Sequence, residues 1–179
     1  YSLDQLTAVS AVDGRYRDKI QELAPIVSEF GLIKNRIQVE CEWLLFLSAT
    51  EEISEVRKLE ESEQAAIRGI YSDLTVEDAE RVKDIEKITN HDVKAIEYYV
   101  KDRLKEQTDL VELIEWIHFA CTSEDINNTA YAIMLSHARS DVLMNVMKTL
   151  TDEIDLMANS NASVAMLSRT HGQVASPTT

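Results

Sequence analysis

The chain has 179 residues, of which 45% are hydrophobic, which suits one ordinary domain or a small domain with part of another. Glycine occurs four times and proline twice while helix-favouring residues are plentiful, so helix is the expected structure. The formal net charge of -14 offers no basic face to a nucleic acid, and no apolar run has the length of a membrane span.

The cysteines, histidines and glycines further restrict the compartment and the cofactors that are expected for this protein. Cys41 and Cys121 form neither a C-x-x-C pair nor a cysteine-rich frame, so reduced thiols in the cytoplasm are the simplest interpretation. The N-terminal residues lack the pattern of a secretory signal. The histidines are too scattered for a zinc motif, and no glycine-rich loop could hold a nucleotide phosphate. We therefore expect a cytoplasmic protein without a metal or another cofactor.

Apolar residues at helical spacing predict a series of helices in the first part of the chain. After a turn signal at Asp13-Gly14, helices are expected over about 26–47 and 62–74. Thr75 then has the position of an N-cap, with acidic residues in the first turn of a helix that runs to about Ile88.

The next elements are also predicted to be helical, with one helix around 96–104 and a short one over 110–119. Thr122 then begins a long stretch without glycine or proline, and Asp125, three residues later, completes a capping pattern. This helix is expected to run to about Asn159. Its apolar residues lie on several sides, which is typical of a helix inside a bundle.

The C-terminal residues place His171 in a polar loop, after which Ser176-Pro177 has the pattern of a new helix start. The predicted fold class is all-α. We expect an N-terminal helical domain over 1–110, followed over 111–179 by the start of an incomplete helical bundle that contains its first long helix.

Several polar residues could carry chemistry, and each has a plainer alternative. His171 can give or take a proton near neutral pH, but it could equally be a surface histidine or one that braces its loop. Asn90-His91-Asp92 stands where a helix begins, where capping is the favoured role. Thr122-Ser123 could cap its helix, or could bind a carboxylate or phosphate at the positive helix end.

Three further positions carry weaker signals. Arg15-Tyr16 could hold a phosphate through the planar guanidinium, although a surface ion pair is the commoner fate of an arginine. His118 lies in an apolar stretch and is best interpreted as a core histidine with its hydrogen bonds satisfied. His137 is expected to serve packing or the polarity of the bundle.

Four blocks of sequence, in this order, carry a resemblance to a known family. Together they resemble the bacterial-type adenylosuccinate lyases, which belong to the fumarase/aspartase superfamily. The resemblance covers essentially the whole chain. The blocks are LTAVSAVDGRY at 6–16, TNHDVKA at 89–95, HFACTSEDINN at 118–128 and SRTHGQ at 168–173.

The resemblance implies an enzyme of purine nucleotide (AMP) biosynthesis that releases fumarate by β-elimination from adenylosuccinate and from a succinylated imidazole ribotide. A base removes a proton beside a carboxylate, the carbanion is stabilised as an aci-carboxylate, and an acid protonates the departing nitrogen. By the family pattern, His171 is that catalytic acid. The family's helical bundle forms a homotetramer whose sites draw residues from several subunits.

The same resemblance assigns substrate-binding residues, which are listed here by their expected role. Arg15 and Tyr16 would bind the substrate phosphate. Asn90, His91 and Asp92 would line the site. Thr122 and Ser123 would bind the succinyl carboxylate, with His118 close by.

The chain also departs from the family pattern, at Val174 and Ser176, where the family usually has proline and threonine. A mobile loop that carries the family's serine base has no counterpart among the 179 residues, so we expect this chain alone to be inactive. Two other functions stay open. One is another superfamily activity, such as argininosuccinate lyase, fumarase or aspartase, which the blocks at Asp13–Tyr16 and Asn90–Asp92 disfavour. The other is a non-catalytic helical interaction module.

Overall fold

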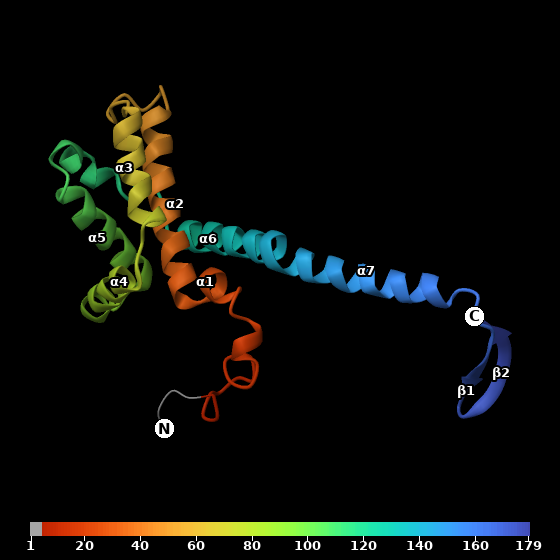
Figure 1. The fold of residues 1–179 in the computed structure, drawn as a ribbon. Coiled ribbons are helices and arrows are strands. Elements are labelled where there is room, and N and C mark those ends of the chain that lie inside the picture. Colours follow the sequence, from red (N-terminus) through yellow and green to blue (C-terminus); the bar gives the residue numbers. More distant parts are fainter. Residues whose placement is uncertain (1–4) are drawn as a thin grey trace. The chain divides into compact units, whose positions relative to one another are not determined.

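A computed structural model describes residues 5–179, which form two compact units, one ending at Ala138 and one running from Arg139 to Thr179. The predicted all-α class is confirmed, with one small sheet added (Figure 1). The division into domains over 1–110 and 111–179 stays a prediction. The first unit contains a 3₁₀ helix (Arg17–Lys19), α1 (Ala24–Val27), α2 (Glu29–Ala49), α3 (Glu61–Ser72), α4 (Val76–Thr89), α5 (Asp92–Lys105), a 3₁₀ helix (Thr108–Trp116) and α6 (Ser123–His137).

Ser28 divides the helix that was expected over 26–47 into α1 and α2. Its backbone is extended, and its hydroxyl oxygen accepts the N–H of Gly31 at 3.3 Å, which starts α2. The two helices approach closely here, since a Cβ atom on Gly31 would lie 2.2 Å from the carbonyl oxygen of Ile26. The position therefore requires glycine.

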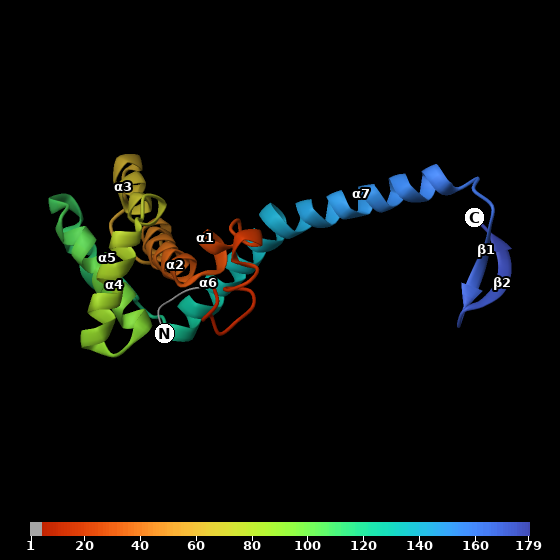
Figure 2. The same cartoon turned by 60° about the horizontal axis from the view of Figure 1, so that its bottom comes forward.

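Helix α2 is the central element of the first unit, in contact with α1, α3, α4, α5 and α6 (Figures 1 and 2). It buries residues on several sides, including the charged side chains of Arg36 and Glu40. A helix packed on several sides brings its buried polar groups against the neighbouring elements. The largest fully buried apolar residues of this unit include Ile37, Leu44, Leu47, Ile67, Ile96, Leu104, Leu110, Leu113 and Ile126.

Two predicted helix starts are confirmed, because capping boxes occur at Thr75 with Asp78 and at Thr122 with Asp125. The segment expected as a helix over 110–119 is different. Its 3₁₀ helix ends at Trp116, and a turn follows in which His118 and Ala120 both have positive φ. This turn leads directly into α6.

A π-helical segment (Ala138–Leu143) begins at the last residue of the first unit, and α7 (Met144–Asn161) of the second unit follows it. The predicted long helix is thus confirmed to residue 161, with a change of helical register at the π segment. Two antiparallel strands follow, β1 (Met166–Thr170) and β2 (Gln173–Thr178). The helix start predicted at Ser176-Pro177 is wrong, because both residues lie in β2. Each strand of a two-stranded sheet is an edge, where proline is tolerated.

Candidate functional site

The junction between α4 and α5 carries the first group of predicted site residues. Asn90 ends α4 in the left-handed conformation, at φ 53°, with its N–H bonded to the carbonyl of Glu86 at 2.8 Å. His91 caps α5, since its Nδ1 accepts the N–H of Lys94 at 3.1 Å. Both residues thus cap a helix, but Asn90 caps the end of α4 rather than a helix start, and the cap at the start of α5 is His91 rather than Asn90 or Asp92. Because Nδ1 accepts, the proton of the neutral ring lies on Nε2, which is left as a donor.

Asp92 is tied to α2 by a short ion pair. Its Oδ2 accepts from Nη2 of Arg36 at 2.6 Å, and its Oδ1 accepts the N–H of Val93 at 2.9 Å. Burial raises the pKa of Asp92, but the Val93 N–H and the charge and hydrogen bond of Arg36 outweigh it, so the net pKa is lowered. The carboxylate therefore stays ionised and fixed in place.

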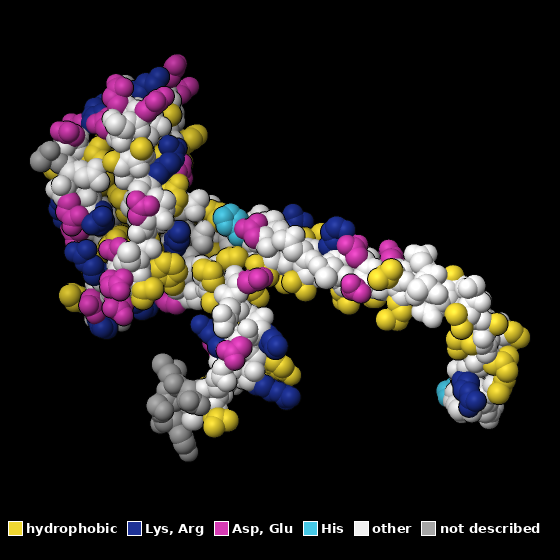
Figure 3. All heavy atoms as spheres, viewed as in Figure 1, with side chains coloured by type: hydrophobic (Ala, Val, Ile, Leu, Met, Phe, Trp, Pro, Cys, Tyr) yellow, Lys and Arg dark blue, Asp and Glu magenta, His cyan; other side chains and the backbone are white. Residues whose placement is uncertain are grey.

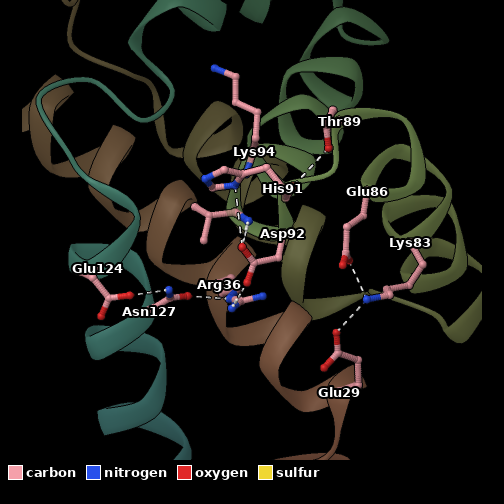
Figure 4. A network of polar contacts seen from close by, with 11 residues as sticks. Glu29, Arg36, Lys83, Glu86, Thr89, His91, Asp92, Lys94, Glu124 and Asn127 are labelled. Atoms are coloured by element: carbon pink, nitrogen blue, oxygen red, sulfur yellow. Dashed lines mark hydrogen bonds and ion pairs between the residues drawn. The ribbon is translucent and has the colours of Figure 1, made fainter.

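Arg36 also holds the first turns of α6 (Figure 4). Its Nε donates to Oδ1 of Asn127 at 2.9 Å, and the amide of Asn127 donates to Glu124 at 3.0 Å. The side chain of Arg36 is 5% exposed, so it lies among the helices rather than in solvent. Sequence analysis did not identify Arg36 as part of the site, although the position of this arginine among the apolar residues of a predicted helix could have indicated a buried role.

The N-terminus of α6 presents Thr122 and Ser123. The N–H of Thr122 donates to Oδ2 of Asp125 at 2.8 Å, which completes the predicted cap. Thr122 is exposed and Ser123 half-buried, so their hydroxyls and the first-turn N–H groups can meet a ligand. Such a helix end favours an anion. Arg36 thus brings together the start of α5 and the start of α6.

A shallow pocket of about 470 Å³ opens beside the α4–α5 junction, where α5 begins. Lys83 and Glu86 line this pocket, and Figure 4 shows Lys83 paired to Glu29 and Glu86. Its lining combines basic and acidic groups, so it suits a polar ligand. The lining residues are Lys83, Glu86, Lys87, Asn90, His91 and Asp92.

His118 occupies the turn before α6 and is half-buried rather than fully in the core, and among the described residues only its Nδ1 has a partner, which sequence analysis did not identify. Its Nδ1 lies 2.6 Å from Oε1 of Glu40, a carboxyl group with no exposed surface. Nothing in the local pattern of the helix singled out Glu40, because the two residues are 78 positions apart.

Arg15 and Tyr16 follow the predicted turn, which is confirmed by the bond from the Gly14 N–H to the Ser10 carbonyl at 2.9 Å. The guanidinium of Arg15 lies over the Tyr16 ring, 5.3 Å from its centroid. Arg17, not Arg15, forms the local ion pair with Asp13. Among residues 5–179, no hydrogen bond or ion pair joins Arg15 or Tyr16 to the other candidates.

His171 lies in the second unit, at the tip of the β1–β2 hairpin. It and Gly172 have positive φ values of 49° and 76°, as a two-residue hairpin turn requires. The loop expected here is therefore an ordered turn, and the imidazole is exposed without a hydrogen-bond partner within the described part of the chain.

Neither a metal site nor a membrane span is found in the described residues: 5–179 contain no cluster of three or more potential metal ligands, and none of their helices is long and apolar enough to cross a bilayer. The candidate chemistry consists of protein donors, namely hydroxyls, imidazoles, helix N-termini and the Arg15 guanidinium. This set can bind anionic groups and move a proton.

Residues 14–179 match the family described as Lyase, and the chain belongs to this family of lyases. Among its relatives are three adenylosuccinate lyases. It is 49% identical to the one from Haemophilus influenzae and 48% to the one from Escherichia coli (strain K12), each over 177 residues. It is 45% identical over 178 residues to the one from Legionella pneumophila (strain Corby). These matches span 99% of this chain and 39% of the length of each relative.

Proposed function

We propose that the chain is part of an adenylosuccinate lyase, which releases fumarate by β-elimination from adenylosuccinate and from the succinylated imidazole ribotide of purine biosynthesis. The observation that carries the proposal is its similarity to adenylosuccinate lyases along 99% of its length. The paired helix N-termini around Arg36 support it, because this substrate carries carboxylates and a phosphate that need such donors.

The binding roles follow from the free donors of the first unit. Thr122 and Ser123 offer hydroxyls and helix N–H groups to the succinyl carboxylate. His91 offers its Nε2–H, since Nδ1 is occupied by the cap. Asn90 and Asp92 line the same place and fix the position of His91 between the two helices.

Arg15 and Tyr16 bind the substrate phosphate in this proposal. The Arg15 guanidinium has no acidic partner within residues 5–179, so all its donors are available, and stacking on Tyr16 limits the directions in which they point. No resident cofactor is required, because protonation and charge stabilisation by side chains suffice for this elimination.

His171 is the catalytic acid in this proposal. In the described residues its ring is not committed to either tautomer by a hydrogen bond, unlike the rings of His91 and His118. A proton donor must exchange its proton in each turnover, so an uncommitted imidazole at an exposed tip suits the role.

The whole enzyme is proposed to be a cytoplasmic homotetramer. Support comes from α7, which buries no residue within the described chain although it carries many apolar side chains (Figure 3). Faces of this kind are typical of bundle helices that pack against other helices. The free thiols of Cys41 and Cys121 agree with a reducing compartment. The exposed apolar residues of α7 include Met144, Val146, Met147, Leu150, Ile154, Leu156 and Met157.

The test uses the full-length protein with adenylosuccinate, argininosuccinate and malate as substrates. Fumarate release from adenylosuccinate is expected. Turnover of either other substrate alone would assign a different superfamily activity, and no turnover would favour an interaction module. His171→Gln should lower kcat by about 10²-fold or more, as loss of a general acid does. His137→Gln, the same change at an exposed residue of α6, is the matched control and should keep its activity.

A further inference from the structure

Glu40 is a buried carboxyl group that the proposed reaction does not use. Its side chain has no exposed surface, and within the described residues its Oε2 has no hydrogen-bond partner. Oε1 lies 2.6 Å from Nδ1 of His118. An ionised carboxylate in such a place, with one oxygen unpaired, is strongly disfavoured.

The backbone holds His118 in an unusual conformation that keeps this contact. His118 is in the left-handed region at φ 63°, and Ala120 follows at φ 57°, where residues other than glycine are uncommon. The indole N–H of Trp43 on α2 donates to the carbonyl of Phe119 at 2.8 Å and anchors the turn. Helix α2 thus fixes both the backbone and the ring of His118.

Three proton arrangements are compatible with the short contact. An ionised Glu40 beside a neutral His118 that carries its proton on Nδ1 leaves one net negative charge buried. A protonated Glu40 that donates to Nδ1 is neutral overall, and so is an ionised Glu40 beside an imidazolium. In both neutral arrangements Nε2 of His118 carries a proton. The buried environment therefore selects an Nε2–H donor.

The groups around Glu40 have opposing effects, and their balance favours its protonated form. Burial raises the pKa of Glu40, the hydrogen bond and charge of His118 oppose the rise, and the charge of Glu97 on α5 adds to it, so that the net pKa is raised. Burial and, to a lesser extent, the charge of Glu40 raise the pKa of the thiols of Cys41 and Cys121, which keeps both thiols neutral. Apart from His118 itself, none of these neighbours carries a positive charge. None of them therefore favours an ionised Glu40 beside a His118 whose Nε2 is unprotonated.

We propose that Glu40 is a positioning residue that holds the imidazole of His118 through Nδ1 and keeps Nε2 protonated, so that His118 presents a hydrogen-bond donor in the turn before α6. Such a donor binds a carboxylate or phosphate oxygen and cannot serve as a base. Only the identity of the bound substrate rests on the proposed function; the proton arrangement does not.

The proton on Nε2 can be observed directly in the full-length protein with ¹⁵N-labelled histidine rings. The His118 signals are assigned by their loss in His118→Gln. The expected ¹⁵N spectrum near neutral pH shows a protonated Nε2. A bare Nε2 with the proton on Nδ1 would overturn the proposal. This measurement does not involve turnover, so failure of the proposed lyase reaction would leave its result intact.

Variants of Glu40 test the positioning role. In Glu40→Gln the amide N–H can donate to Nδ1 from the same place, so Nε2 should stay protonated. Glu40→Ala removes the partner and should give a mixture of His118 tautomers. Glu42→Gln, the same change on a half-exposed residue of α2, is the control and should leave the His118 signals unchanged. Unchanged His118 signals in Glu40→Ala would contradict the proposal; if that variant does not fold, the wild-type spectrum and Glu40→Gln still decide.

Kinetics of the same variants separate positioning from simple destabilisation. Loss of one oriented donor to an anionic group is worth about 1.5–3 kcal/mol, or about 10- to 150-fold in binding. Glu40→Ala should raise KM for adenylosuccinate by about this factor, and Glu40→Gln should restore most of it. A fall in kcat alone, or no recovery in Glu40→Gln, would contradict the positioning role.

Discussion

Replacing Arg36 by methionine should detach the starts of α5 and α6 from each other. Methionine keeps most of the packing of the arginine stem but removes the ion pair with Asp92 and the hydrogen bond to Asn127. Breaking a fully buried ion pair costs about 3–5 kcal/mol, whereas an exposed pair is worth about 0–1 kcal/mol. Arg36 is 5% exposed and Asp92 45%, so we expect an intermediate loss of about 2–3 kcal/mol.

The loss should be local, because among residues 5–179 the contacts of Arg36 with Asp92 and Asn127 involve only α2, α5 and α6. Hydrogen exchange followed by mass spectrometry should therefore show faster exchange in the first turns of α5 and α6, with little change in α3. Arg68→Met is the matched control, since Arg68 forms a half-exposed pair with Glu42 and should lose about 1 kcal/mol or less. Equal effects of the two substitutions would refute the reasoning about Arg36.

Acid should reduce the difference between Arg36→Met and the wild type. The pKa of Asp92 is lower in the folded state than in the unfolded chain, where an aspartate has a pKa of about 3.9. Its stabilising contribution is therefore present above that unfolded value and is lost as the pH falls through the folded pKa. A difference that grows on acidification would contradict the assignment of this ion pair.

Three further predictions concern Ser48, Glu63 and Gly172. Ser48→Ala should lower the free energy of unfolding, measured with urea, by about 1–3 kcal/mol. The buried N–H of Leu59 donates to the serine Oγ at 3.0 Å and would lose its acceptor. A change below about 0.5 kcal/mol would show that this N–H finds another partner. The hydrogen bonds of Arg57 lower the pKa of Glu63 to about 2. The contribution of Glu63 to the stability of the fold is therefore present above about pH 4.5, its ordinary pKa, and is lost as the pH falls towards 2. Glu63→Gln should flatten the pH–stability curve between these values, and an unchanged slope would argue against the ion pair. Gly172→Ala should weaken the hairpin by about 1 kcal/mol. The cost is backbone strain at φ +76°, because no atom lies within 4 Å of an added Cβ that could clash with it. Faster amide exchange in β1 and β2 would report this weakening.

Features that depend on neighbouring residues could be predicted from the sequence. The capping boxes at Thr75 and Thr122 rest on an acid three residues after the cap, and both occur as expected. The predicted helix over 26–47 lacked only the break at Ser28. That break depends on the close approach of α1 and α2 at Gly31, which helical periodicity does not encode.

Contacts between distant residues could not be predicted in this way. The ion pair of Arg36 with Asp92 joins positions 56 residues apart, and the contact of Glu40 with His118 joins positions 78 apart. Both partners on α2 are charged residues among apolar ones, but their sequence context does not say which helix they face. The family resemblance pointed to the exposed donors, whereas the groups that hold these donors emerge only from the packing.

Arg36 and Glu40 lie four residues apart on α2, and therefore on one face of that helix. One of them fixes the start of α5, which carries His91, and the other fixes the ring of His118. A single helical turn, about 6 Å of rise at 1.5 Å per residue, thus sets the spacing between the anchors of two imidazole donors. Exposed residues at the helix starts could then be exchanged to suit a different anionic substrate, while this spacing stays the same.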